Sequence, residues 1–133
     1  MDAMAIGRLA ELTGVKVTTI RYYESIGLLP APPRTGGNRR AYGRSDAERL
    51  IFIRRSRDFG LSLEAIRELL VLDLDRAQPC QAATRIAQAH LAEIERRIAE
   101  LDALKAHFRT IIDRCDGERV ESCAIMKTLR GGF

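Results

Sequence analysis

The sequence predicts a mainly α-helical protein: an N-terminal winged helix-turn-helix domain, a long helix that pairs with a second copy, and a short C-terminal helix behind a loop. Three observations lead to this fold class. Two short helical patterns joined by a glycine open the chain, a proline- and glycine-rich segment follows at 30–37, and an apolar heptad repeat extends over about 81–113. Apolar residues three and four positions apart are the main sequence signal of a helix.

The first two predicted helices form a helix-turn-helix. Gly14 ends the first helix, because glycine readily adopts the left-handed conformation at a helix terminus. The second helix extends to about Ser25, and the Thr18 hydroxyl is its expected cap. The apolar faces of the pair are formed by Ile6, Leu9, Ala10, Leu12, Val17, Ile20 and Tyr23. In this motif the second helix enters the major groove of DNA.

The segment at 30–42 predicts a small two-stranded wing. Its three prolines exclude a helix, and the Gly36-Gly37-Asn38 run suits the positive-φ positions of a hairpin turn. Arg39 and Arg40 then lie on the returning strand, where they can hold the backbone of a DNA duplex.

Two further helices connect the wing to the rest of the chain. Ser45 begins the first helix with Glu48 as its capping-box partner, and Gly60 ends it. Ser62 caps the second, and an acidic, proline-containing break follows at 73–79. We therefore predict a DNA-binding domain with its connecting helices at 1–75, a dimerisation helix at 80–113, and a loop with a short helix at 114–133.

The long helix carries a coiled-coil seam. The seam positions alternate at spacings of four and three residues and are Ala87, Leu91, Ile94, Ile98, Leu101, Lys105, Phe108 and Ile112. Seven of these eight residues are apolar, and the chain offers no second helix of matching length to cover them. A second copy of the chain is therefore the expected partner.

Charge is distributed unevenly along the 133 residues. Residues 1–60 hold eleven Lys and Arg against six Asp and Glu, whereas residues 61–133 hold eleven against twelve. The first part of the chain is where a polyanion would be attracted. There is no apolar run of membrane-spanning length and no secretion signal, so we expect a cytoplasmic protein with no membrane partner.

The three cysteines favour metal binding over a disulfide framework. Cys80 precedes the long helix, Cys115 follows it, and Cys123 lies at the far end of a polar loop that can fold two thiolates onto one ion. A helix of this length measures roughly 50 Å, so Cys80 cannot reach the other two within one chain. In an antiparallel dimer it would meet the partner's pair, forming a site of three thiolates. Burial as small apolar residues, the alternative, fits poorly with three cysteines at helix ends or loop edges.

Several motifs resemble one family of regulators. They are Ile6-Gly7-Arg8-Leu9-Ala10, Thr19-Ile20-Arg21-Tyr22-Tyr23-Glu24 and Gly27-Leu28-Leu29-Pro30, followed by Leu50, Ile53, Gly60, Leu63, Ile66 and Leu69-Leu70. On these residues the chain resembles the MerR family of transcriptional regulators. The resemblance implies a winged-helix DNA-binding domain, an antiparallel coiled-coil dimer and a C-terminal effector site. No catalytic motif is present, so we do not expect an enzyme.

The resemblance also implies a set of DNA contacts. Thr18 and Thr19 offer hydroxyls beside helix N-terminal amides, while Arg21 suits base edges or phosphates. The predicted set is Lys16, Thr18, Thr19, Arg21, Tyr22, Arg39, Arg40 and Tyr42. Packing in the core is the alternative role for Tyr42.

The metal ligands implied by the resemblance are Cys80, Cys115 and Cys123. In the family, a cysteine at the position of Cys80 accompanies sensors of divalent ions, whereas sensors of copper(I), silver and gold usually have serine there. Three thiolates suit mercury(II), lead(II) or cadmium(II) ahead of zinc(II), which favours a fourth ligand. Asp116, Glu118 or water could supply that ligand.

The resemblance finally implies how such a protein works. A homodimer would hold double-stranded promoter DNA for the RNA polymerase holoenzyme, repress transcription without metal, and activate it by distorting the promoter when a thiophilic divalent metal binds. Two alternatives stay open. One is a MerR-type regulator whose effector is an oxidant or an organic molecule, and the other is a small dimeric thiol protein or metal carrier.

Overall fold

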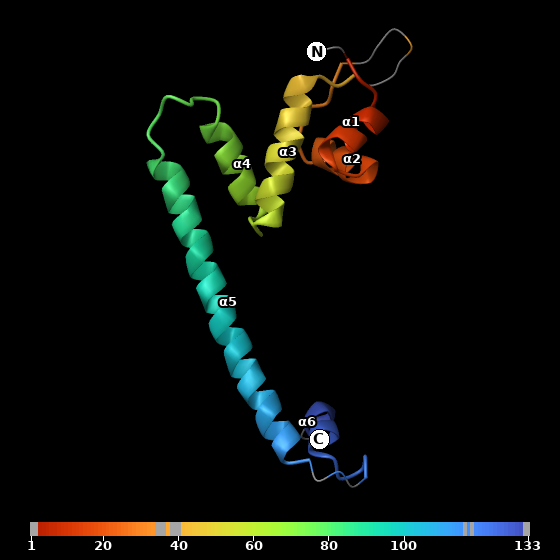
Figure 1. Cartoon of the computed structure of the whole chain (residues 1–133), viewed down its shortest axis with the longest axis vertical. Coiled ribbons are helices and arrows are strands. Elements are labelled where there is room, and N and C mark those ends of the chain that lie inside the picture. The colour runs from red at the N-terminus through yellow and green to blue at the C-terminus, as the bar shows by residue number, and fades with distance from the viewer. Residues whose placement is uncertain (1–2, 34–36, 38–40, 116, 118, 132–133) are drawn as a thin grey trace. The chain divides into compact units, whose positions relative to one another are not determined.

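A computed structural model describes residues 3–33, 37, 41–115, 117 and 119–131. This described part of the chain contains six α-helices and confirms the mainly helical fold class (Figure 1). The chain divides into two compact units, Met1–Ala83 and Thr84–Phe133. The first unit holds the helix-turn-helix, and the second holds most of the long helix and everything after it.

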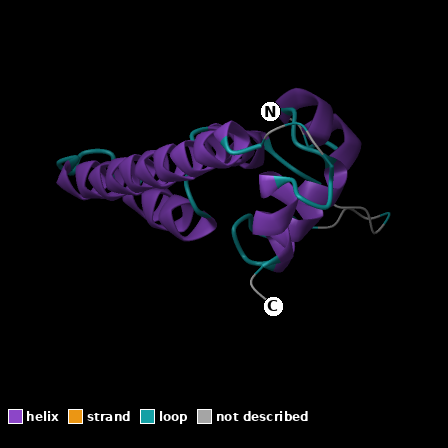
Figure 2. Cartoon of the chain, turned by 90° about the horizontal axis from the view of Figure 1, so that it is seen from below, coloured by secondary structure: helices purple, strands orange, loops and turns teal. Residues whose placement is uncertain are grey.

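The helices follow one another with connections of different lengths. They are α1 (Ile6–Thr13), α2 (Val17–Ser25), α3 (Arg44–Asp58), α4 (Leu63–Leu72), α5 (Gln81–Asp113) and α6 (Ala124–Arg130). Figure 2 distinguishes them from the loops and turns that join them. None of the helices in the described residues is long and apolar enough to cross a membrane.

Two predicted helix caps are wrong by two residues each. Thr18 does not cap α2, because that helix already begins at Val17 and the capping position is Lys16. Similarly, α3 begins at Arg44 rather than after Ser45, and its first turn is closed by the Asp46 carboxylate, which accepts from the Gly43 N–H at 2.9 Å. The shorter acidic side chain of Asp46 thus closes the first turn in place of the predicted capping box of Ser45 and Glu48.

The other predicted boundaries agree with the structure. Ser62 caps α4, with its hydroxyl accepting from the Ala65 N–H at 3.1 Å. The break after α4 is also present, since the helix ends at Leu72 and the next begins at Gln81.

The predicted wing is only partly described. Its base is closed by a hydrogen bond from the Ala41 N–H to the Pro33 carbonyl at 3.0 Å. Tyr42 does not pair within the wing but forms an isolated antiparallel bridge with Met4. Among the described residues no strand is formed, so the expected two-stranded hairpin is not seen there. The tip, including Arg39 and Arg40, lies outside the described residues.

The core of the first unit lies where the first four helices and the base of the wing meet. Its fully buried side chains are Leu9, Ile20, Leu28, Leu29, Tyr42, Leu50, Ile53 and Ile66. Most are the periodic apolar residues of the sequence. Their burial leaves the opposite, polar face of α2 exposed to solvent.

Gly14 is required at the turn between α1 and α2. Its φ is +73°, and its N–H bonds to the Ala10 carbonyl. A Cβ at this position would lie 2.4 Å from Nη1 of Arg54, which donates to the Thr13 carbonyl at 2.8 Å. Backbone conformation and the close approach of an arginine therefore both select glycine.

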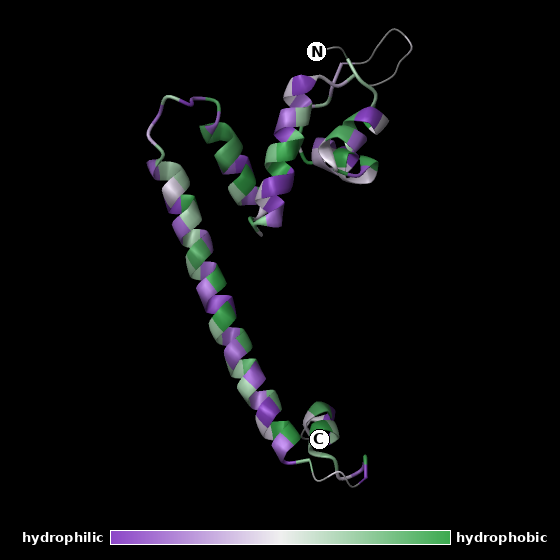
Figure 3. Ribbon diagram, viewed as in Figure 1, coloured by the Kyte–Doolittle hydropathy of each residue, from purple (hydrophilic) through white to green (hydrophobic). Residues whose placement is uncertain are grey.

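The apolar seam of α5 is exposed in the single chain. Figure 3 shows hydrophobic and hydrophilic residues alternating along this helix. Large seam residues are open to solvent, with Leu101 64% and Ile98 54% exposed. The one buried residue of α5 is Ile111, next to the predicted seam position Ile112. The helix α6 lies near this end of α5 (Figure 1).

Ion pairs line another face of α5. Arg96 pairs with both Glu93 and Glu100, and Arg97 donates to Glu93 at 3.2 Å. Hydrogen bonds from Arg96 and Arg97 lower the pKa of Glu93 to about 2. Pairs three and four residues apart support a long solvated helix.

Candidate metal centre and DNA-reading surface

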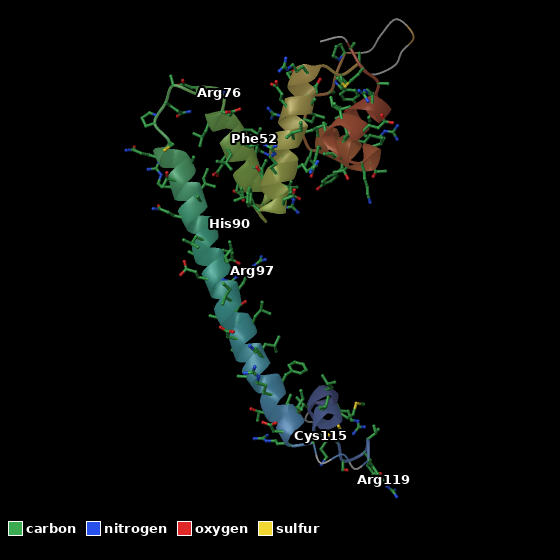
Figure 4. The ribbon with its side chains drawn as sticks, viewed as in Figure 1. Phe52, Arg76, His90, Arg97, Cys115 and Arg119 are labelled. Atoms are coloured by element: carbon green, nitrogen blue, oxygen red, sulfur yellow. The ribbon has the colours of Figure 1, made fainter. Side chains whose placement is uncertain are left out.

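Two cysteines are brought together by the turns between α5 and α6. Cys115 follows the last turn of α5, where its N–H bonds to the Ile112 carbonyl at 3.0 Å, and its position at this end of the helix is visible in Figure 4. A second turn, in which the Cys123 N–H bonds to the Val120 carbonyl at 3.3 Å, places Cys123 directly before α6. Both thiols are half-buried.

The two sulfurs have the spacing of a shared metal ion. Their Sγ atoms are 3.7 Å apart and form no disulfide. Two thiolates bound at about 2.3 Å to one tetrahedral ion stand about 3.8 Å from each other. The donor set is soft and suits thiophilic ions. The residues present therefore fit half of a thiolate metal site.

The surroundings of Cys123 favour its thiolate form. The backbone amide of Met126 makes the largest contribution to lowering the pKa of this thiol, and the Cys115 thiol, the Ile125 amide and the charge of Arg130 lower it further, against an opposing effect of burial. A thiol that ionises readily is a better metal ligand.

Arg130 is a residue of this site that the sequence reasoning missed. Its guanidinium reaches back across the loop, donating to the carbonyls of Val120 and Glu121 at 3.4 Å each. It lies seven residues after Cys123, which is two helical turns, and hence on the same face of α6. This seven-residue spacing was the feature of the sequence from which Arg130 could have been identified.

Cys80 lies apart from this pair within one chain. It belongs to the first compact unit and is exposed just before α5, whose 33 residues separate it from Cys115. It lines a largely apolar cavity of about 280 Å³ together with Phe52, Leu69 and Pro79; Figure 4 labels Phe52. Among the described residues no group of three or more His, Cys, Asp or Glu in one chain could hold a metal ion.

The predicted DNA contacts on α2 lie on its outer side. Lys16, Thr18, Arg21 and Tyr22 are exposed, with Tyr22 52% exposed, and Thr19 is half-exposed. The neighbouring Tyr23 is buried, its ring centroid 6.0 Å from that of Tyr22. The helix thus separates a packed face from a polar face that a DNA groove could receive.

Tyr42 takes the second of its two predicted roles. Its ring is fully buried, and its hydroxyl donates to the Glu24 carboxylate. This burial contradicts the prediction of a DNA contact, because the side chain presents no surface. The strand-end position that suggested a contact equally suits a residue that closes the core against α2.

Two sequence families match the chain. One, described as "MerR HTH family regulatory protein", matches residues 4–71, and the other, described as "MerR, DNA binding", matches residues 47–111. Together they cover the helix-turn-helix, the wing, the connecting helices and most of α5.

Relatives and solved structures match over nearly the whole length. The HTH-type transcriptional regulator ZntR of Escherichia coli K12 is 42% identical over 130 residues, covering 96% of this chain and 92% of its own. The transcription regulator PbrR691 of Ralstonia metallidurans CH34, solved in complex with lead(II), has a TM-score of 0.84 at 36% identity and covers 95% of this chain and 98% of its own.

A third similar protein is the dual-function transcriptional regulator MerR of Bacillus megaterium MB1, solved in complex with mercury(II). It has a TM-score of 0.72 at 30% identity, covering 96% of this chain and 100% of its own. With the exposed polar face of α2, the paired cysteines and these matches over nearly its full length, the chain belongs to the MerR family of helix-turn-helix transcriptional regulators, which are not enzymes.

Proposed function

We propose that this chain is a metal-responsive regulator that binds promoter DNA as an antiparallel homodimer. The domain at 1–75 grips the DNA, the helix at 80–113 forms the dimer, and the segment at 114–133 receives the metal. The observation that carries the proposal is the 3.7 Å separation of the Cys115 and Cys123 sulfurs at the end of a long helix with an exposed apolar seam.

In the proposed dimer, Cys80 of the partner subunit completes each site. Two thiolates supplied by one chain leave a thiophilic ion short of ligands, and Cys80 is the remaining cysteine of the sequence. A bound ion would tie the C-terminal loop of one protomer to the start of α5 of the other. We propose mercury(II), lead(II) or cadmium(II) ahead of zinc(II), because three thiolates satisfy the softer ions without a fourth ligand.

Regulation then requires two states of the dimer that differ in metal affinity. Cys80 directly follows the break after α4, and α4 packs on α3, so a change at Cys80 can be passed to the DNA-binding helices. In the metal-bound state the dimer distorts the promoter, which lets RNA polymerase holoenzyme start transcription. In the other state the same dimer represses.

Metal titration of the reduced protein tests the sensing part of this proposal. Mercury(II), lead(II) and cadmium(II) are each expected to produce thiolate-to-metal absorbance, and zinc(II) to displace cadmium(II) weakly. Cys115→Ser and Cys123→Ser should abolish the signal, whereas Ser122→Ala, in the same turn, should keep it. A titration that no cysteine variant alters would contradict metal sensing and favour an organic effector.

A mobility-shift assay tests the DNA-binding part separately. The wild-type protein should retain a promoter duplex against heparin, and Arg21→Ala should weaken that complex without changing the metal titration. Equal retention of the two proteins would contradict the proposed role of α2.

A further inference from the structure

Two arginines from different helices hold the turn that follows α2. Nε of Arg49, on α3, donates to the Leu28 carbonyl at 2.7 Å, and Nη2 of Arg67, on α4, donates to the Ile26 carbonyl at 2.9 Å. Ile26 is the C-terminal cap of α2. We call these two bonds the carbonyl clamp.

The Arg67 bond of the clamp satisfies an acceptor that the helix leaves open, the carbonyl of the C-terminal cap Ile26. The last carbonyls of an α-helix have no partner within it, and a positive charge near them interacts favourably with the helix dipole. A guanidinium is well suited to this task, because its planar group loses little freedom when it forms a directed hydrogen bond.

Apart from the Tyr42 hydroxyl, which donates to the Glu24 carboxylate, the remaining attachment of α2 is less directional. Ile20 and Tyr23 bury one face of the helix in the core, and the hydrophobic effect that favours this burial is non-directional. Hydrogen bonds at one end, by contrast, depend on distance and angle. The end of α2 that carries the clamp is reached from both α3 and α4.

We propose that Arg49 and Arg67 are positioning residues for DNA reading. They set the tilt of α2, and thereby the positions of Thr18, Arg21 and Tyr22 against the bases, without contributing base contacts of their own. This inference rests on the proposed DNA-binding function. It also gives α4, the helix that precedes Cys80 in the chain, a direct hydrogen bond to the end of the reading helix.

Arg67 gives the sharper test because it is exposed, so its loss leaves the core intact. Arg67→Met removes the charge and the donor while keeping an unbranched stem. The matched control is Arg57→Met, since Arg57 is also exposed and its hydrogen bond is local, to the Leu61 carbonyl four residues away at 2.9 Å. Both variants remove one positive charge from the same unit.

The readout is sequence discrimination by metal-free protein. The probes are a duplex that the wild type selects from a random double-stranded library, and a scrambled duplex of equal length. Arg67→Met should reduce the ratio of the two affinities about fivefold or more, as expected for a lost hydrogen bond to a charged group. Arg57→Met should weaken both affinities equally, through one fewer phosphate-neutralising charge.

Two further measurements make the result decisive. Arg67→Lys, which keeps the charge and one donor, should recover most of the discrimination. The positioning role would be overturned if Arg67→Met weakened the affinity for both duplexes equally. It would also be overturned if Arg67→Met lowered the thermal midpoint of unfolding more than Arg57→Met does. A wild type that selects no sequence would refute the proposed function itself. An Arg67→Met variant that discriminates as well as the wild type would refute only the positioning role.

Discussion

The two paired cysteines differ because of what surrounds each side chain. Cys123 stands directly before α6, where backbone amides and the Arg130 guanidinium favour a negative charge, whereas Cys115 follows the carbonyl end of α5. Metal binding displaces thiol protons, so a thiolate that is already favoured keeps its ligand role at lower pH. The sulfur of Cys123 is therefore favoured as a thiolate ligand before an ion binds.

Alkylation can test whether the pKa of the Cys123 thiol is lowered in the folded protein. Because the pKa of Cys123 is lowered, its rate of reaction with iodoacetamide should reach half-maximum at a lower pH in the folded protein than in the same chain unfolded in urea. Peptide mass spectrometry reports the rate at Cys123 itself. Arg130→Gln should move the folded midpoint upward. A folded midpoint at or above the urea value would show that the site does not favour the thiolate.

Glycine substitutions test the turn of the helix-turn-helix. Gly14→Ala forces a side chain into a left-handed residue and against Arg54, and should reduce the free energy of unfolding by about 2 kcal/mol. Gly7→Ala is the matched control, since nothing lies within 4 Å of the added Cβ inside α1. It should be neutral or stabilise by up to about 1 kcal/mol. Urea denaturation checks both values, and equal effects would contradict the steric role of Gly14.

Single residues also show where sequence reasoning reaches its limit. Gly14 and Ser62 could be assigned from the sequence because the left-handed turn and the helix cap that they form are local features. The cap at Gly43 and Asp46 was missed because two overlapping capping patterns compete there, and the packing of α3 decides between them. The burial of Tyr42 depends on Glu24 and Met4, both distant in sequence.

Among the elements, α5 was the easiest to predict, because a regular heptad pattern over 33 residues is typical of a long paired helix and of few alternative structures. The wing was the hardest, since Tyr42 at its described end pairs with Met4 of the N-terminal segment. Long-range pairing of this kind leaves no periodic trace in the sequence. The same holds for the carbonyl clamp, whose arginines resemble ordinary surface charges until their partners are known.

The seam of α5 yields a prediction about assembly. Leu101→Asp should weaken the dimer more than about a hundredfold, because each of two buried leucines contributes about 1.5–3 kcal/mol and a charge would replace it. Ala103→Asp, an exposed position of the same helix off the seam, adds the same charge as a control. Sedimentation across a range of concentrations measures both. Equal dissociation of the two variants would place the dimer contact elsewhere.

For the whole molecule, the proposed metal site makes the dimer a condition of metal sensing. One chain brings together Cys115 and Cys123, and the proposed third ligand comes from another chain. Neither the sequence nor a single chain can test this, because the contact that matters is between copies. The two sites of the dimer would then be complementary rather than independent.

Mixed dimers test that arrangement. Neither Cys80→Ser nor the Cys115→Ser, Cys123→Ser double variant should form the three-thiolate lead(II) site as a homodimer. A heterodimer purified with two different affinity tags should regain one site, formed by Cys80 of the double variant and the cysteine pair of the other chain. Metal stoichiometry by mass spectrometry is the measurement. A heterodimer that binds no more metal than either parent would contradict a shared site.

The bare stripe along α5 has a consequence for the life of the protein in the cell. A newly synthesised monomer exposes a long row of apolar side chains, and Leu101, Ile98 and Leu91 are all more than half exposed. Such surfaces attract chaperones and proteases. Excess monomers would be degraded while dimers persist, so the exposed seam would limit the amount of regulator in the cell.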